Sequence, residues 1–433
     1  MKRYPAYDPP EYANWQPEPG VMAEFRARLA ADGERAEIIA GLDAPGHIAL
    51  LSGLYRARLH DIALKRWVKQ GVISKAWLGT GEEAATIGAV RALEPGDHVG
   101  PMIRNAGACH EMGMPVADML RAYLGTYDTI TRGRDLHTGD LERGVVPPVS
   151  MVASLVPVFA GIALAFKKQG RASVALTWVG DGSTRTAEFH EGAMLASRLR
   201  VPAIYIIQNN QVALGTELKA GVAGDLRRLH EAYGAAGLTC DGNNVLDVFA
   251  ATRLAAAECR RGNGPVFLTA ETFRLGGHAT HDEAEARGTF AASLFEHWGR
   301  RDPVGMYETW LVESGPALAA EEPGSTMAAG IELESDVAGA EAAFPAERGS
   351  ARLRERTDPQ KAGAPGGQTD PGRVNSAKAM ERNRSVVAAL EERIVAEVEA
   401  AAEEALKSRG SAQPPPESVL EGVYALPTRP TTG

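Results

Sequence analysis

The sequence predicts an α/β protein built on a mostly parallel, doubly wound sheet with helices on both faces. Two apolar runs, 173–179 and 201–207, are continuous rather than alternating, which is typical of strands buried on both faces. Between them, residues 186–200 carry apolar side chains at helical spacing. A strand, a crossover helix and a second strand form one right-handed parallel unit, so these two strands are expected to be neighbours.

Polar residues follow both strands directly. Gly180-Asp181-Gly182 ends the first strand, and the second ends at Gln208-Asn209-Asn210. Because open α/β sheets bind ligands at the carboxyl ends of their strands, Asp181 and Asn210 are expected side by side at such a place. Carboxylate and amide oxygens suit Mg²⁺ or Ca²⁺, and the glycines leave room for a phosphate at the start of the next helix. The pattern predicts a metal-bridged diphosphate site, although each motif alone is compatible with an ordinary turn.

Composition excludes two broad classes of function. The chain has 433 residues, of which 44% are hydrophobic and 23% charged, as in a soluble globular protein. Its formal net charge of −9 argues against a general nucleic-acid binder, because phosphate backbones attract concentrated Lys and Arg. The three cysteines are scattered, the N-terminus lacks an apolar stretch for secretion, and no apolar run reaches ~18 residues. We therefore expect a cytoplasmic protein with neither nucleic-acid nor membrane partners.

Further segments are predicted before and after this strand–helix–strand unit in the sequence. Residues 1–45 are rich in Pro, Asp, Glu and Ala with weak periodicity and are interpreted as an N-terminal surface arm. The ligand-binding domain is expected at 46–313, with a Gly-, Arg- and Pro-rich loop at 131–149. Its other predicted elements are helices at 47–70, 150–170, 224–234 and 245–260, a short strand and turn at 237–244, and a strand at 265–271.

Two segments follow this domain. Residues 314–379 are rich in Ala, Glu, Gly, Pro and Ser, and such a composition cannot bury enough surface to offset its ordering entropy, so we predict a disordered insertion. Residues 380–433 are predicted to form a helix and a tail that pack on the domain. An apolar stripe at helical spacing supports that helix, although the same stripe would also suit a coiled coil; it consists of Val387, Leu390, Ile394, Ala401 and Ala405.

Longer stretches of the sequence resemble a known family. Gly-Asp-Gly and Asn-Asn, separated by residues 183–208, look like the thiamine diphosphate motif. The sequence around these motifs resembles the alpha subunit of the decarboxylating component of 2-oxo acid dehydrogenase complexes. Residues 79–107 resemble the same subunit; they read GTGEEAATIGAVRALEPGDHVGPMIRNAG. The resemblance covers 47–313 and 381–426 and implies the thiamine diphosphate-binding fold.

The resemblance also implies roles for individual residues. Asp181 and the side chain of Asn210 would bind Mg²⁺, with the backbone carbonyl of Val212 as the third protein ligand. Arg104 corresponds to an arginine that contacts the cofactor's diphosphate, and His278 to a phosphate-contacting histidine, to which we also assign a catalytic role. From the residues alone, the surface ion-pair partner is the more common explanation of an arginine such as Arg104, and a lone histidine such as His278 is usually structural.

Further residues complete this expected site. Arg274 and Asp282 are expected to order the loop that carries His278, and the loop at 131–149 holds His137, for which a functional role is left open. Ala279 stands where animal relatives carry a phosphorylatable serine, so that switch is not expected. The other residues expected to bind the cofactor are Ile103, Ser150, Val152, Gly180, Gly182, Ser183 and Gln208.

The function implied by the resemblance is shared between chains. With a beta subunit, as an alpha2beta2 assembly, this chain would decarboxylate a small 2-oxo acid such as pyruvate or a branched-chain 2-oxo acid. The acyl group would pass to a lipoyl-bearing acyltransferase, which makes the activity that of an oxidoreductase. Two alternatives remain open: another thiamine diphosphate enzyme, acetoin-cleaving or a transketolase-like half, and a non-catalytic paralogue that acts as a scaffold subunit.

Overall fold

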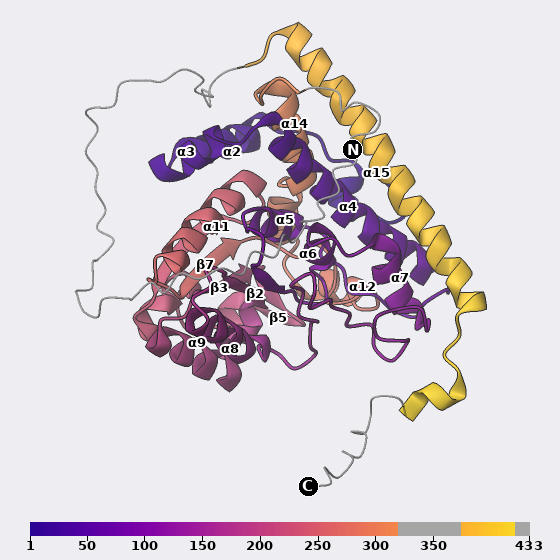
Figure 1. The fold of residues 1–433 in the computed structure, drawn as a ribbon. Coiled ribbons are helices and arrows are strands. Elements are labelled where there is room, and N and C mark those ends of the chain that lie inside the picture. Colours follow the sequence, from indigo (N-terminus) through magenta and orange to yellow (C-terminus); the bar gives the residue numbers. More distant parts are fainter. Residues whose placement is uncertain (319–373, 421–433) are drawn as a thin grey trace, which may run out of the picture.

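The computed structural model describes residues 1–318 and 374–420 and is built around one parallel sheet (Figure 1). The five strands lie in the order β1-β2-β3-β7-β6 and are all parallel, which confirms the predicted fold class. β3 begins at Ala203 rather than 201, in keeping with Pro202, which has no N–H to donate. The strands are β1 (His98–Gly100), β2 (Ala175–Gly180), β3 (Ala203–Asn209), β6 (Ala236–Asp241) and β7 (Val266–Glu271).

Helices cover both faces of the sheet. On one face, Leu176 and Trp178 of β2 pack with α5 (Glu83–Arg91) and α11 (Val245–Arg260). On the other face, Ala175 and Val179 pack with α8 (Leu155–Lys168) and α9 (Ala187–Leu199). Because both faces are buried, the strands are continuously apolar up to their last residues, where the polar site begins.

A second, helical layer packs beside the sheet and includes the N-terminal residues. Residues 1–45 do not form the expected surface arm; they fold into α1 (Pro10–Ala13), α2 (Pro19–Ala30) and α3 (Gly33–Ala40). Tyr12 and Phe25 are only 0% and 2% exposed and belong to the core that surrounds α4 (Ala44–Lys69) and α14 (Pro303–Glu313). The short helices, two of them begun by proline, hide the periodicity that a longer helix would display.

The C-terminal helix α15 (Ala377–Ser411) runs along the outside of α14, α4 and α7 (Val116–Leu124) (Figure 1). It begins before the expected residue 380, and its buried stripe contains Ala402 in place of Ala401. Most of the predicted insertion at 314–379 lies outside the described residues. Ion pairs fasten the helix to α4, for example Arg66 with Glu399 at 2.8 Å.

The shorter elements connect these layers. No single helix in the described parts of the chain is long and apolar enough to cross a membrane, although α3 and α4, joined at a 98° bend, pass that test as a pair by length and composition. The shorter elements are α6 (Ala106–Glu111), η1 (Asp181–Arg185), β4 (Val212–Ala213), β5 (Thr216–Glu217), α10 (Leu218–Gly221), η2 (Leu226–Tyr233), α12 (Glu283–Thr289), α13 (Ala292–Gly299) and η3 (Pro416–Leu420).

Candidate functional site

Asp181 and Asn210 emerge at the same edge of the sheet. The parallel register pairs Gly180 of β2 with Gln208 of β3, so the residues that follow leave neighbouring strand ends. Asp181 and Asn210 are only 2% and 1% exposed. The Oδ1 atom of Asp181 accepts a hydrogen bond from the Gly182 N–H at 2.7 Å, whereas its buried Oδ2 has no hydrogen-bond partner among residues 1–318 and 374–420. One carboxylate oxygen is therefore left for a ligand.

Two arginines lie close to this carboxylate. The Nη2 atom of Arg104 lies 3.4 Å from the point where a Cβ would stand on Gly180, which places the guanidinium beside the end of β2. Arg274, 2% exposed, has no partner for Nε or Nη2 in the described structure. Burial and the charge of Arg104 lower the pKa of Arg274 to about 10. A buried cation without hydrogen bonds is costly, and an anion would relieve that cost.

The same two arginines act on Asp181. Burial raises the pKa of Asp181, although the Gly182 N–H and the charges of Arg104 and Arg274 oppose the shift. The site thus holds an unpaired carboxylate oxygen and an unpaired guanidinium within each other's electrostatic range. A Mg²⁺ ion held by Asp181 and Asn210 and a diphosphate held by the arginines would satisfy both groups. The residues present therefore fit a metal diphosphate.

The ligand set for a metal contains few charged side chains. No cluster of three His, Cys, Asp or Glu side chains suited to a metal is present among the residues that the structure describes. The predicted ligands are instead one carboxylate, the Asn210 amide and the Val212 carbonyl. Val212 starts β4, and its N–H lies 3.4 Å from the Oδ1 atom of Asn210. Oxygen donors with open positions for phosphate and water are typical of Mg²⁺ bound with a phosphorylated ligand.

Glu82 is a site residue that the sequence analysis did not assign. Its fully buried carboxylate accepts hydrogen bonds from the Nε atom of Arg104 at 2.7 Å and from the Nδ2 atom of Asn210 at 2.9 Å. Glu82 therefore holds both an expected phosphate ligand and an expected metal ligand. No local pattern predicts this contact, because Asn210 is far from Glu82 in the chain.

His278 belongs to the same electrostatic cluster. Burial, followed by the charges of Arg274 and Arg104, lowers the pKa of His278 to about 4, so the imidazole is neutral near pH 7. The side chain of Asp282 accepts from the Ala279 N–H at 3.0 Å and so orders this loop. Arg274, expected to order the loop as well, forms no such hydrogen bond through Nε or Nη2 in the described structure, and its charge acts on Asp181 and His278.

Other predicted residues lie at or shortly after the strand ends. Gln208 is fully buried, and its Oε1 atom accepts from the Nδ2 atom of Asn105 at 3.2 Å. A Cβ on Gly182 would come within 2.5 Å of the Ala213 Cβ, so this position favours glycine. Ser183 follows in η1 and is half-buried. Ile103, also half-buried, directly precedes Arg104.

Ser150 and Val152 are exposed, unlike the residues of this buried cluster. Val152 is 52% exposed on the loop before α8, and Ser150 is also exposed. The hydroxyl of Ser150 lies 3.2 Å from the Nε2 atom of His137, whose Nδ1 atom lies 2.7 Å from a carboxylate oxygen of Asp135. This Asp135–His137–Ser150 chain was not predicted, and no described hydrogen bond or ion pair joins it to Asp181.

Comparisons with known proteins agree on one family. Residues 54–345 match the family model described as "Dehydrogenase E1 component". The 2-oxoisovalerate dehydrogenase subunit alpha of Bacillus subtilis (strain 168) is 32% identical over 253 residues, which cover 57% of this chain and 75% of the relative. The pyruvate dehydrogenase E1 component subunit alpha of Acholeplasma laidlawii is 29% identical over 262 residues, 59% of this chain and 72% of the relative. The somatic, mitochondrial pyruvate dehydrogenase E1 alpha subunit of Homo sapiens is 30% identical over 242 residues, 56% of this chain and 61% of the relative.

Proposed function

This chain belongs to the dehydrogenase E1 component family, and we propose that it binds thiamine diphosphate and Mg²⁺ as the alpha subunit of a 2-oxo acid dehydrogenase. One observation carries the proposal. At the same edge of the sheet, a buried carboxylate oxygen of Asp181, after β2, and the buried Nε and Nη2 atoms of Arg274, after β7, lack hydrogen-bond partners among the described residues. A metal ion and a diphosphate are the ligands that complete such a pair.

Each group would have a distinct task. Asp181, Asn210 and the Val212 carbonyl would hold the metal ion. Arg104 and Arg274 would bind the diphosphate oxygens. Arginine suits this task because its rigid fork of donors matches phosphate geometry and because it stays charged even with a pKa of about 10, as in Arg274.

His278 would act as a neutral hydrogen-bond donor. Its lowered pKa keeps one ring N–H and one free ring nitrogen near pH 7, so it can donate to a phosphate oxygen without adding charge. The bound cofactor supplies an electron sink for the loss of CO₂ from a 2-oxo acid. The residues of this chain would anchor and orient the cofactor for that step.

A beta subunit would complete the active site and provide the glutamate that activates the cofactor's pyrimidine ring, in an alpha2beta2 assembly. Exposed apolar side chains support a partner: Met151 is 65% and Val152 52% exposed beside Ser150, and Leu214, two residues after Val212, is 61% exposed. The acyl group would pass to a lipoyl-bearing acyltransferase, and a cytoplasmic location is part of the same proposal.

Co-expression with a beta subunit tests this function. The purified assembly is given thiamine diphosphate, Mg²⁺, an artificial electron acceptor and a panel that contains pyruvate, branched-chain 2-oxo acids and acetoin. We expect cofactor-dependent CO₂ release from at least one 2-oxo acid, and loss of that activity in Asp181→Asn. Activity with acetoin alone would favour an acetoin-cleaving enzyme, and a folded assembly that is inactive on the whole panel would favour a scaffold subunit.

A further inference from the structure

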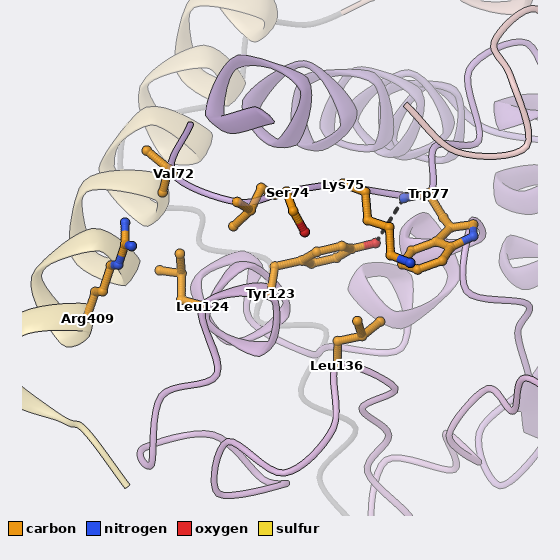
Figure 2. A pocket seen from close by; sticks show the side chains of 9 residues that line it. Val72, Ser74, Lys75, Trp77, Tyr123, Leu124, Leu136 and Arg409 are labelled. Atoms are coloured by element: carbon orange, nitrogen blue, oxygen red, sulfur yellow. Dashed lines mark hydrogen bonds between the residues drawn. The ribbon is translucent and has the colours of Figure 1, made fainter. Parts of the chain in front are cut away.

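A cavity of about 200 Å³ lies outside the proposed cofactor site, between α7, the segment after α4 and the last turn of α15 (Figure 2). We propose that it binds a small amphipathic carboxylate, meaning a carboxylic acid with an aromatic or branched aliphatic tail. None of the residues predicted to bind the cofactor or the metal lines it. Its walls are formed by Val72, Ile73, Ser74, Lys75, Trp77, Tyr123, Leu124, Leu136 and Arg409.

Most of the residues that line the cavity are apolar or aromatic, and two cations lie at its ends. Figure 2 shows the Tyr123 ring across the middle, with Arg409 at one end and Lys75 beside Trp77 at the other. No carboxylate lines the cavity. An anionic head at either cation, with an apolar tail against Tyr123 and Leu136, would match this distribution.

Both cations are available to a ligand. Neither Lys75 nor Arg409 forms an ion pair within the described part of the chain, whereas other basic residues beside α15 are paired, such as Arg66 with Glu399 at 2.8 Å. The Nζ atom of Lys75 lies 5.1 Å from the centroid of the Trp77 ring and so stays over an aromatic face.

The volume limits the size of the ligand. About 200 Å³ equals the space of roughly seven water molecules at ~30 Å³ each. This space suits a carboxylate with one small ring or one branched chain, and it is too small for a nucleotide or for a cofactor of the size of thiamine diphosphate.

The cavity walls are bonded to the loops of the proposed active site. Ala76, between two lining residues, donates to the Oγ1 atom of Thr280 at 3.1 Å and accepts from the Thr280 N–H at 2.9 Å. Thr280 lies two residues after His278. On the opposite wall, Leu136 precedes His137, which contacts Ser150. A ligand that orders these walls would therefore also restrain the two loops, which makes the cavity a regulatory site.

Calorimetric titration of the full-length chain tests the binding, with phenylacetate and isovalerate as probes and phenylacetamide as the uncharged control. We expect saturable binding of at least one acid and none of the amide. Lys75→Gln or Arg409→Gln should weaken binding about fivefold, the size of one exposed ion pair. Lys407 is an exposed cation on α15, the helix that carries Arg409, but it does not line the cavity. Lys407→Gln should therefore leave the affinity unchanged.

Two further measurements complete the test. Leu136→Trp, which fills the cavity, should abolish binding, and amide hydrogen exchange at residues 276–282 should slow when the acid binds. Absence of saturable binding to the folded chain, or binding that all three cavity variants leave unchanged, would overturn the proposal. Unchanged exchange at 276–282 would overturn the regulatory part. These readouts need neither thiamine diphosphate nor turnover, so their failure is distinguishable from failure of the proposed function.

Discussion

Two buried arginines in this molecule have opposite surroundings. Arg58, in the helical layer, is 1% exposed, and its guanidinium pairs with Glu83 and, at 3.0 Å, with Asp302. Burial alone would lower the pKa of Arg58, but these carboxylates outweigh burial and raise it well above its ordinary value. Arg274, at the strand ends, is 2% exposed, and its pKa falls to about 10.

The carboxylates show the same contrast. Asp302 is fully buried, but Arg58 and Arg3 outweigh the effect of burial and lower its pKa. Asp181 is buried to a similar extent, and its pKa is raised. Glu83, the other carboxylate paired with Arg58, has a raised pKa because burial is the largest cause, so the direction of a pKa shift alone does not distinguish the two regions. They differ in pairing: removal of one partner from a buried ion pair leaves the other charge uncompensated, whereas the free atoms of Asp181 and Arg274 can accept a ligand.

The largest expected effect is a loss of stability when Arg58 is replaced. Arg58→Met should lower the free energy of unfolding by about 3–5 kcal/mol, because Glu83 and Asp302 would remain buried without their cation. Urea denaturation measures the change. If this variant were as stable as the wild type, the satisfied cluster would not be what holds the helical layer together.

Arg274→Met is the matched change at the strand ends and should act in the opposite way. The free energy of unfolding should stay the same or rise, because an unpaired buried charge is removed. The affinity for pyrophosphate with Mg²⁺ should fall by roughly 10- to 150-fold, equivalent to about 1.5–3 kcal/mol for a charge-assisted hydrogen bond. Both values are measured on one preparation, by denaturation and by calorimetry. A loss of stability like that of Arg58→Met would remove the distinction between the two arginines.

Glu82→Gln should raise the affinity for Mg²⁺ pyrophosphate. Its carboxylate holds Arg104 and Asn210 and adds negative charge where a diphosphate would bind, so the neutral amide should tighten pyrophosphate binding severalfold, about 1 kcal/mol. Calorimetry with Mg²⁺ pyrophosphate measures this. Weaker binding by the variant would indicate that Glu82 supports the ligand rather than competes with it.

The smallest expected effect is a change of stability and of ligand affinity with pH, caused by protonation of His278. Its pKa is about 4 in the folded chain against an ordinary 6.5, so without a ligand its contribution to stability is present above pH 6.5 and lost as the pH falls through 4. A bound anion offsets the charges of Arg274 and Arg104 and raises this pKa. Proton uptake on binding means that affinity tightens as the pH falls toward 4, more in the wild type than in His278→Asn. Equal pH profiles for the two proteins would exclude this coupling.

The sequence predicts the sheet well and the charge contacts poorly. Continuous apolar runs predicted β2, β3 and β7, and the resemblance to alpha subunits of 2-oxo acid dehydrogenases is confirmed. The N-terminal helices were missed because they are short, although apolar residues at 21, 25 and 29 carry the helical spacing.

The roles of Glu82 and Arg274 depend on contacts between distant parts of the chain. Whether a buried guanidinium is paired is decided by packing, which no local pattern reports. The expectation that Arg274 orders its loop stays a prediction; no sequence pattern indicated that its Nε and Nη2 atoms would be buried without hydrogen-bond partners in the described structure. The roles expected for Ser150 and Val152 stay predictions, because their loop lies at the exposed surface where a partner would complete it.

One measurement tests the central claim most directly: calorimetric titration of thiamine diphosphate with Mg²⁺ into the wild-type assembly and into Asp181→Asn. Because Oδ2 of Asp181 has no other partner in the described structure, we predict one metal-dependent site per chain in the wild type and an affinity at least about a hundredfold lower in the variant. Equal affinities in the two proteins, or wild-type binding that is unaffected by removal of Mg²⁺, would contradict the account.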